Sequence, residues 1–276
     1  TGFFEGRYIY QAKRGYLTSQ AEFKESQIEA EGLAIRYLEA GKGDTIVALD
    51  SLTWGMPRLY HALAQKYRVV VLEAPTPDGD GLPKSPKNLA AITAQASASL
   101  APDGYSLIGT SLGANAALWQ ALQDPEKTQA LVLISSIAIL PSGGPPETSG
   151  SLPVQSLLAH LENAPDLPPL APSGASREHV LLESLKEASH DAEVESRLGD
   201  IQCATLAVFG VEDKMVSSEA PRVYRAKIPN CNISLVYDAG HLIEAERPEA
   251  LINLVLDFVE RRETFIVGRE SRVINP

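Results

Sequence analysis

The sequence predicts a mostly parallel, doubly wound α/β sheet with helices on both faces. Two patterns lead to this prediction. Short, unbroken apolar runs, typical of strands covered on both sides, alternate along the chain with stretches of helical periodicity. A segment of alternating polar and apolar residues on either side of Gly32 precedes them and is typical of an antiparallel hairpin. Strands that alternate with helices pair in parallel, because each helix carries the chain back to the start of the next strand.

The expected strands follow in chain order. The hairpin comprises residues 26–31 and 33–38. The apolar runs that we expect to be buried strands are residues 45–49, 67–72, 106–108, 130–134, 205–209 and 233–237. The tail, from residue 264 to 267 and onward, is a candidate for a short edge strand.

The expected helices lie between these strands. Residues 89–100 are rich in alanine, and residues 247–262 place apolar side chains on one face. The other predicted helices are residues 57–66, 114–119 and 217–227. Residues 74–83 are rich in proline, glycine and aspartate, so we expect a surface loop there.

The composition changes between residues 141 and 199, where proline, glycine, serine and acidic residues accumulate. Three stretches with an amphipathic pattern lie in this region, at residues 152–161, 177–188 and 192–198. We therefore expect a helical cap insertion between the two parts of a core, residues 1–140 and 200–276. Residues 1–25 are expected to form an N-terminal arm that packs either on the body of the chain or on a second subunit, so a homodimer is left open.

The chain has 276 residues and a formal net charge of −11. This negative charge argues against nucleic acid or an anionic membrane surface as the main partner. The chain has no run of about 18 apolar residues, so we expect no membrane span and a cytoplasmic protein. Cys203 and Cys231 each directly precede a predicted strand, and we expect reduced thiols rather than a disulfide.

One segment links a buried strand directly to a helix through the pattern G-x-S-x-G, and it reads Gly109-Thr110-Ser111-Leu112-Gly113. In this context the serine sits at a sharp, strained turn, and the glycines let strand and helix pass closely. The N–H of Leu112 is expected at a helix N-terminus, where backbone donors are unpaired and the dipole favours negative charge. The alternative interpretation is an ordinary glycine-lined turn with a capping serine.

Three polar residues follow three different strands at the point where each strand ends. Ser111 follows the strand before the G-x-S-x-G turn, and Asp213 and His241 follow the last two long strands. The carboxyl ends of parallel strands meet at one edge of a sheet, so we expect these residues to lie together. A serine hydroxyl needs an imidazole to take its proton, and the imidazole needs a buried carboxylate to fix its tautomer. The order Ser, Asp, His is that of a triad on such a sheet.

Other residues compete for two of these roles. His241 alone among the five histidines follows a sheet strand, and its alternative role is a capping histidine near a helix start. For the acid, the alternatives to Asp213 are Glu212 and Asp238. Glu212 points the other way if its loop is extended, and Asp238 is too near His241 in sequence to reach the far ring nitrogen easily. We therefore prefer Asp213.

At these residues the chain resembles the α/β-hydrolase superfamily. The shared motifs are the turn with Ser111, the Gly-Val-Glu-Asp sequence that ends at Asp213, and Gly-His at 240–241 followed by Glu-Arg-Pro-Glu at 246–249. The resemblance spans roughly residues 26–260 and is closest to the branch with a helical cap after the sixth strand. It implies an eight-stranded sheet, a cap over the site and hydrolysis through a serine-bound acyl intermediate. A serine at the elbow, rather than an aspartate, disfavours a haloalkane dehalogenase or an epoxide hydrolase.

The chain departs from the family pattern after the third strand. The family usually has His-Gly there, and a backbone N–H of that loop completes the oxyanion hole. Here the residues are Asp50 and Ser51. Ser51 does not easily adopt a positive φ, so we expect the loop to run differently, and the Asp50 carboxylate opposes the developing negative charge. The expected oxyanion donors are the N–H of Leu112 and, as the second donor, the N–H of Leu52.

The resemblance and the order of the triad predict a serine hydrolase that cleaves a small ester, thioester or activated carbonyl compound. The alternatives are a carbon–carbon bond hydrolase of ring-cleavage products, a cofactor-free haloperoxidase-like activity, and a protein with little turnover that binds a small ligand or a protein partner. Asp50, Ser51, Trp54 and Met56 are expected to line the pocket, whereas Trp119 is expected in the core. No histidine pair has metal-ligand spacing and no nucleotide-binding glycine loop is present, so we expect no metal and no cofactor.

Overall fold

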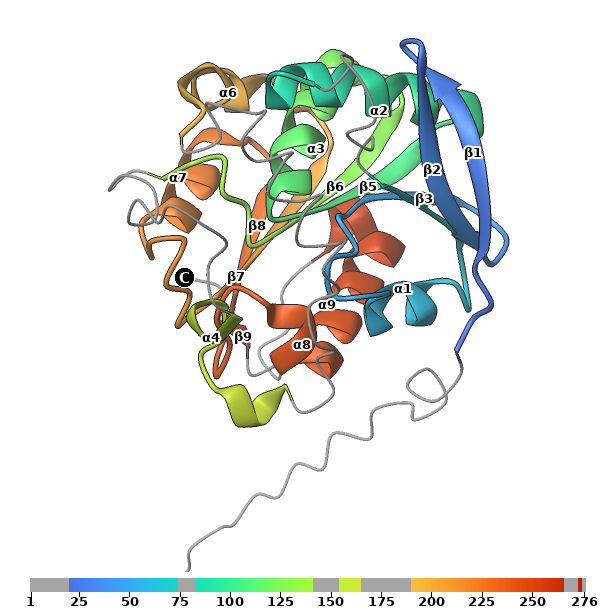
Figure 1. Cartoon of the computed structure of the whole chain (residues 1–276). Coiled ribbons are helices and arrows are strands. Elements are labelled where there is room, and N and C mark those ends of the chain that lie inside the picture. Colours follow the sequence, from blue (N-terminus) through green and yellow to red (C-terminus); the bar gives the residue numbers. More distant parts are fainter. Residues whose placement is uncertain (1–19, 74–82, 141–153, 165–189, 266–272, 275–276) are drawn as a thin grey trace, which may run out of the picture.

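The computed structural model describes residues 20–73, 83–140, 154–164, 190–265 and 273–274, which build one twisted sheet flanked by helices (Figure 1). The strands are β1 (Lys24–Ala30), β2 (Leu33–Ala40), β3 (Thr45–Leu49), β4 (Arg68–Leu72), β5 (Tyr105–Thr110), β6 (Thr128–Ile134), β7 (Ala204–Gly210), β8 (Cys231–Val236) and β9 (Val273–Ile274). Their order in the sheet is β1-β2-β4-β3-β5-β6-β7-β8-β9. Strands β3 to β8 pair in parallel, whereas β1 with β2, β2 with β4 and β8 with β9 are antiparallel. The predicted mostly parallel sheet is confirmed.

The eight strands that the family resemblance implied are β1 to β8, and β9 adds a two-residue strand beside β8. This edge strand lies further along the tail than we expected. Thr264 belongs instead to the short 3-10 helix η4 (Arg262–Thr264). Phe265 follows it and is buried, so its side chain holds the chain against the body instead of along the sheet edge. The expected residues 266 and 267 lie outside the described residues.

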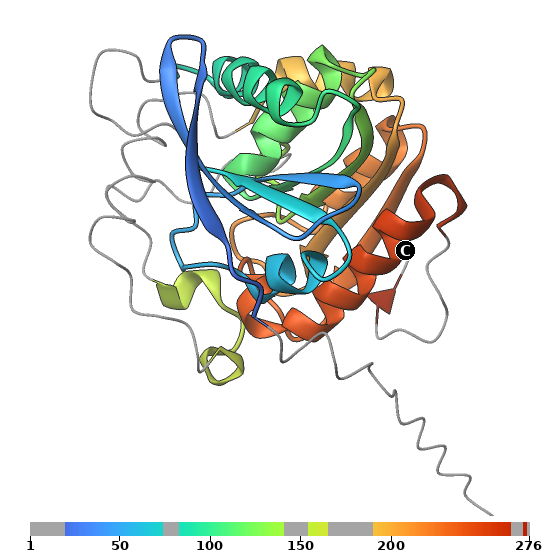
Figure 2. The same cartoon turned by 90° about the vertical axis from the view of Figure 1, so that its right-hand side faces the viewer.

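Helices cover both faces of the sheet (Figure 2). One face carries α2 (Pro86–Leu100), α3 (Leu112–Gln123), α6 (Ala192–Arg197) and α7 (Ala220–Lys227). The other face carries α1 (Arg58–Leu63), α8 (Ile243–Glu246) and α9 (Pro248–Arg261). Three short elements complete the described chain: α4 (Val154–Leu157), η2 (Leu161–Asn163) and η3 (Leu198–Asp200). The doubly wound arrangement therefore encloses two apolar cores, one on each side of the sheet.

Each of the five predicted helices differs at its ends from the observed one, and local hydrogen bonding explains two of these differences. α1 is shorter than the expected range 57–66, because tight turns such as Lys66 N–H to Leu63 O (3.0 Å) close the chain before β4. α2 is longer than expected, because Ser85 caps it by accepting a hydrogen bond from Asn88 N–H (3.2 Å), and Pro86 fits the first helical position.

The two described parts of the expected insertion pack on the core. Near its end, Asp191 accepts a hydrogen bond from the indole N–H of Trp119 (2.7 Å), and Val194 and Leu198 join the core beside α3. Trp119 is buried, which confirms its expected core position. Within its described residues, 154–161, the first amphipathic stretch forms α4 and the start of η2, and the stretch at 177–188 lies outside the described residues. The division into core and cap stays a prediction.

Both cysteines are free thiols, as we expected. Burial raises the pKa of Cys203 to about 11 and that of Cys231 to about 12, so both stay protonated at neutral pH. None of the helices in the described ranges has the length and apolar composition that crossing a membrane requires.

The contact between α3 and β3 gives a prediction about stability. A Cβ on Gly113 would lie 2.0 Å from the backbone oxygen of Leu49, a distance that requires the backbone itself to shift. We expect Gly113→Ala to lower the free energy of unfolding by roughly 3 kcal/mol, measured by urea denaturation. Gly199→Ala is the control, because its Cβ would meet only Lys227 O at 3.7 Å and should change stability by less than about 0.5 kcal/mol. Equal effects of the two substitutions would contradict this account.

Candidate active site

The G-x-S-x-G segment forms the sharp turn between β5 and α3. Ser111 has φ 51° and ψ −113°, a strained conformation for a residue with a side chain. Its N–H donates to Ile134 O at the end of β6 (2.9 Å), which fixes the turn to the neighbouring strand. Gly109 permits the close approach, because a Cβ there would lie 2.6 Å from the Ala114 Cα. The turn therefore has the geometry of a nucleophile elbow, with the serine at the carboxyl ends of the strands.

The structure brings Ser111, His241 and Asp213 into one hydrogen-bonded chain. The Ser111 Oγ lies 2.9 Å from His241 Nε2, and His241 Nδ1 lies 2.9 Å from Asp213 Oδ2. The side chains of His241 and Asp213 are only 3% and 1% exposed. Serine, imidazole and buried carboxylate thus stand in the arrangement that proton transfer from a serine hydroxyl requires.

Asp213 and His241 also make hydrogen bonds outside this chain. The second oxygen of Asp213, Oδ1, accepts hydrogen bonds from the N–H groups of Met215 (2.8 Å) and Val216 (3.0 Å). The backbone oxygen of His241 accepts a hydrogen bond from the Ser135 hydroxyl (2.7 Å). These contacts leave Asp213 Oδ2 to orient the imidazole.

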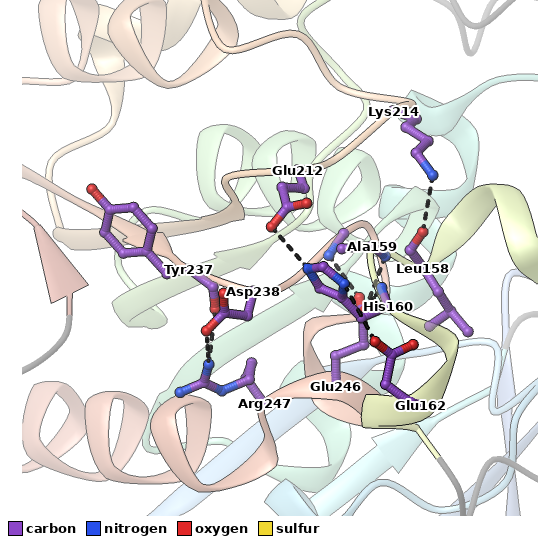
Figure 3. Close-up of polar contacts among 11 residues, drawn as sticks. Leu158, Ala159, His160, Glu162, Glu212, Lys214, Tyr237, Asp238, Glu246 and Arg247 are labelled. Carbon is purple, nitrogen blue, oxygen red and sulfur yellow. Dashed lines mark hydrogen bonds and ion pairs between the residues drawn. The ribbon is translucent and has the colours of Figure 1, made fainter.

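The two alternative acids point elsewhere (Figure 3). Glu212 lies 3.2 Å from the Nε2 of His160, and Asp238 accepts a hydrogen bond from Arg247 (2.8 Å). Both carboxylates are exposed. Of the three acids considered, Asp213 is the one that contacts His241.

The expected oxyanion donors have different surroundings. Leu112 is the first residue of α3, where N–H groups have no partner within the helix. The N–H of Leu52, the expected second donor, instead donates to Asp50 Oδ1 (2.8 Å), so our expectation for Leu52 is not met in this structure. An aspartate readily accepts from the N–H two residues further on, and that turn competes with an open donor. The positive φ of the loop falls on Leu52 (50°) and not on Ser51.

Asp50 is the centre of a half-buried polar network that the sequence did not predict. Besides Leu52 N–H, its carboxylate accepts a hydrogen bond from the hydroxyl of Tyr60 (2.8 Å), and the Thr110 side chain also bonds to it. Burial raises the pKa of Asp50, and the nearby charge of Glu73 raises it further. Burial likewise raises the pKa of Tyr60, with Asp50 as the second cause. In the sequence, the one sign of the contact between Thr110 and Asp50 was the position of Thr110 next to Ser111.

The four residues expected to line the pocket lie in different places: some line a small cavity, and others pack against apolar clusters. Asp50 and Ser51 line a small cavity of about 30 Å³ beside the first turn of α3. Trp54 is half-buried and packs against a small apolar cluster that includes Leu242, next to His241. Met56 packs against the core on the α1 and α9 face. The structure therefore places Asp50 and Ser51 on the cavity, and Trp54 and Met56 away from it.

One group of side chains has donors suited to a metal ion. The ligand atoms of His160, Glu212 and Asp238 lie within 4.8 Å of one another. These atoms already have protein partners, because His160 contacts Glu212 and Asp238 pairs with Arg247 (Figure 3). Exposed carboxylates in such pairs need no ion, so we assign none to this group.

The comparison with known sequences identifies the family. The sequence model of the alpha/beta hydrolase family matches residues 43–254, and the chain therefore belongs to this family. A curated relative, 2-hydroxy-6-oxononadienedioate/2-hydroxy-6-oxononatrienedioate hydrolase 2 of Pseudomonas putida, is 27% identical over 87% of this chain and 95% of its own length.

Solved structures share the fold. A 2-hydroxy-6-oxo-6-phenylhexa-2,4-dienoate hydrolase from a Rhodococcus species superposes with a TM-score of 0.71 at 17% identity, over 87% of this chain and 100% of that one. A membrane phospholipase A, described as a bacterial virulence factor, gives a TM-score of 0.69 at 20% identity, over 90% and 88% of the two chains. At such low identities these likenesses establish the fold alone.

The surroundings of Asp50 predict a pH-dependent stability. In the unfolded chain this carboxyl ionises near its ordinary pKa of 3.8, whereas burial raises the pKa in the folded protein. The unfolded state therefore loses its proton first as the pH rises, and the free energy of unfolding falls. We expect Asp50→Asn to remove this loss, so that its stability relative to wild type increases between pH 4 and pH 7 in denaturation experiments.

Asp103→Asn is the matched control for this series, because Asp103 is exposed. Its stability relative to wild type should stay flat over the same pH range. A flat profile for Asp50→Asn as well, or one that falls with pH, would refute the burial argument.

Proposed function

We propose that the protein is a serine hydrolase that cleaves a small ester, thioester or activated carbonyl compound, with Ser111, His241 and Asp213 as its catalytic triad. The observation that carries this proposal is the continuous hydrogen-bonded chain from Ser111 Oγ through His241 to the buried Asp213. Membership of the alpha/beta hydrolase family supports it.

In the first half of the proposed reaction, His241 Nε2 takes the proton of the Ser111 hydroxyl as the oxygen attacks the substrate carbonyl. Asp213 stabilises the imidazolium that forms and holds its tautomer. The Leu112 N–H, at the positive end of α3, stabilises the negative charge on the carbonyl oxygen. His241 then gives the proton to the leaving group, and an acyl-enzyme remains.

In the second half, His241 takes a proton from water as the water oxygen attacks the acyl group. The bond from the acyl carbon to the Ser111 oxygen then breaks, His241 returns the proton to that oxygen, and the acid is released. The same hydrogen bonds serve both halves, because the base must act once on the serine and once on water. The weak point is the oxyanion hole, since Leu52 N–H is bonded to Asp50. Loss of one oxyanion donor typically lowers the rate by about 10²–10³-fold.

Within this class, we favour a carbon–carbon bond hydrolase acting on an activated carbonyl compound. The curated relative in Pseudomonas putida and the Rhodococcus structure are both named as hydrolases of 2-hydroxy-6-oxo dienoate acids. Such a substrate carries a keto group, which lacks the electron donation of an ester's alkoxy oxygen and so accepts a nucleophile more readily than a simple alkyl ester. An activated carbonyl suits a site with one strong oxyanion donor.

A second candidate function is ligand binding with little turnover. The specific observation in its favour is the Asp50 carboxyl group, which is half-buried next to the elbow and holds the Leu52 N–H. In its ionised form this group opposes the oxyanion that hydrolysis must form. Kinetics on the serine variant separate the two functions.

A fluorophosphonate probe tests the triad directly. We expect one adduct, on Ser111, found by peptide mapping of the wild-type protein. Ser111→Ala should abolish the adduct, and His241→Ala should slow its formation by roughly 10⁴-fold or more, because the serine then lacks its base. His61→Ala is the histidine control, since His61 lies on α1 and contacts Phe23 and Ala21.

A matched pair of acid variants sharpens this test. Asp213→Asn should slow labelling by about 10⁴-fold, because an amide no longer holds the required tautomer. Glu212→Gln, at the preceding position, should react like wild type. A folded wild-type protein without any adduct would exclude the hydrolase proposal and favour ligand binding.

Substrate preference tests the narrower proposal. We expect wild-type protein to cleave 2-hydroxy-6-oxo-6-phenylhexa-2,4-dienoate with a kcat/KM at least about tenfold above that for a simple ethyl ester of similar size, because the conjugated ketone depends less on the second oxyanion donor. Loss of the dienoate absorbance measures the reaction. Ser111→Ala provides the background rate, and faster cleavage of the ester would instead assign the protein to the esterases.

A further inference from the structure

A short segment from the expected insertion runs along the back of the loop that carries His241. The N–H groups of His241 and Leu242 both donate to Leu157 O, at 2.8 Å and 3.3 Å. On the other side, the ammonium group of Lys214 donates to Leu158 O at 3.3 Å (Figure 3). The segment is therefore bonded to the loop of His241 and, through Lys214, to the loop that follows β7.

Glu246 stands between this segment and the loop of His241. It is the last residue of α8, and it is only 4% exposed. Its Oε1 accepts hydrogen bonds from the N–H groups of Ala159 (2.9 Å) and His160 (2.7 Å), and its Oε2 accepts one from Gly240 N–H (2.6 Å). Figure 3 shows the Glu246 side chain reaching the backbone at Ala159 and His160.

The contact at Gly240 is close on all sides. A Cβ there would lie 2.7 Å from Ala159 N and 2.8 Å from Leu157 O. Backbone therefore packs directly on backbone at the residue before His241. Because of this packing, a displacement of the segment by a few tenths of an ångström would also shift the imidazole of His241.

The carboxylate of Glu246 accepts hydrogen bonds from one buried and two part-buried backbone N–H groups. Hydrogen bonds to an ionised acceptor are shorter and about twice as strong as neutral ones, and these three lie between 2.6 and 2.9 Å. An uncharged or shorter side chain would leave at least one of these donors without its charged acceptor, which weakens the contact between the segment and Gly240. No other described side chain accepts a hydrogen bond from both the segment and Gly240.

We propose that Glu246 is a positioning residue for catalysis, which clamps residues 157–160 onto Gly240 and so sets the place of His241 between Ser111 and Asp213. This inference rests on the proposed serine hydrolase function. Glu246 does not contact the reacting atoms. It acts through the backbone, and it makes the position of the insertion segment part of the geometry of the base.

The test compares Glu246→Gln, Glu246→Asp and Glu249→Gln with wild type. Glu249 lies next to α8, but its side chain is 51% exposed and pairs with Arg58, so this variant should behave like wild type. For the two Glu246 variants we expect the maximal rate of fluorophosphonate labelling to fall by up to about 10²-fold, with little change in the half-saturating probe concentration, because misplacement of a catalytic group affects the rate more than binding.

Four outcomes decide the proposal. A slower rate in both Glu246 variants, with full labelling of all molecules at the end point, supports positioning. The aspartate variant keeps the charge, so a pure charge effect would leave that variant at the wild-type rate. Such a result would overturn the proposal. A reduced end point with the remaining molecules reacting at the wild-type rate indicates a merely structural role and also overturns it. Wild-type reactivity in both variants does the same and leaves the hydrolase proposal intact.

Two further observations keep the test decisive. If wild-type protein itself does not react with the probe, the hydrolase proposal fails and this inference fails with it. If the Glu246 variants do not fold, Lys214→Met probes the same segment from its other side by removing the bond to Leu158 O. This variant should slow labelling in the same way but less strongly, and an unchanged rate would count against the clamp.

Discussion

The close approach of α3 to the ends of β3 and β5 is the contact on which the site depends. Gly113 touches the backbone of Leu49, and Gly109 touches Ala114, at distances that exclude any Cβ. This packing holds Ser111 at a positive φ that residues with side chains rarely adopt. The sheet carries the strain, because the bond from Ser111 N–H to Ile134 O ties the turn to β6. The hydroxyl therefore stands above the strand ends, where residues of the other loops reach it.

The same kind of contact joins the loops of the acid and the base. A Cβ on Gly210, at the end of β7, would lie 2.1 Å from Gly240 O, so the two loops meet backbone to backbone. The bond from Glu212 N–H to Ala239 O (3.0 Å) reinforces the contact. The parallel sheet makes β7 and β8 neighbours, and the glycines let their loops converge. The pairing of β7 with β8 and the glycines of their loops together bring Asp213 within hydrogen-bond distance of His241.

Much of this arrangement follows from the sequence, because periodicity marks the strands and parallel strands end at one edge. Ser111, Asp213 and His241 could be placed together on that basis alone. The contacts of Leu52 could not, since a pattern does not decide whether the Asp50 side chain folds back on its own loop. The bonds of Glu246 were also beyond prediction, because His160 lies 86 residues away in the sequence and no local pattern pairs them.

The buried carboxylate of Glu246 and the half-buried one of Asp50 differ in their partners. Glu246 accepts from three backbone N–H groups and lies behind the loop of His241. Asp50 accepts from the Leu52 N–H and the Tyr60 hydroxyl, beside the first turn of α3. In the proposed reaction the first arrangement positions the base, whereas the second takes a donor away from the oxyanion. Under that proposal, a well-positioned base beside a weak oxyanion hole favours substrates whose carbonyl is more electrophilic than that of a simple ester.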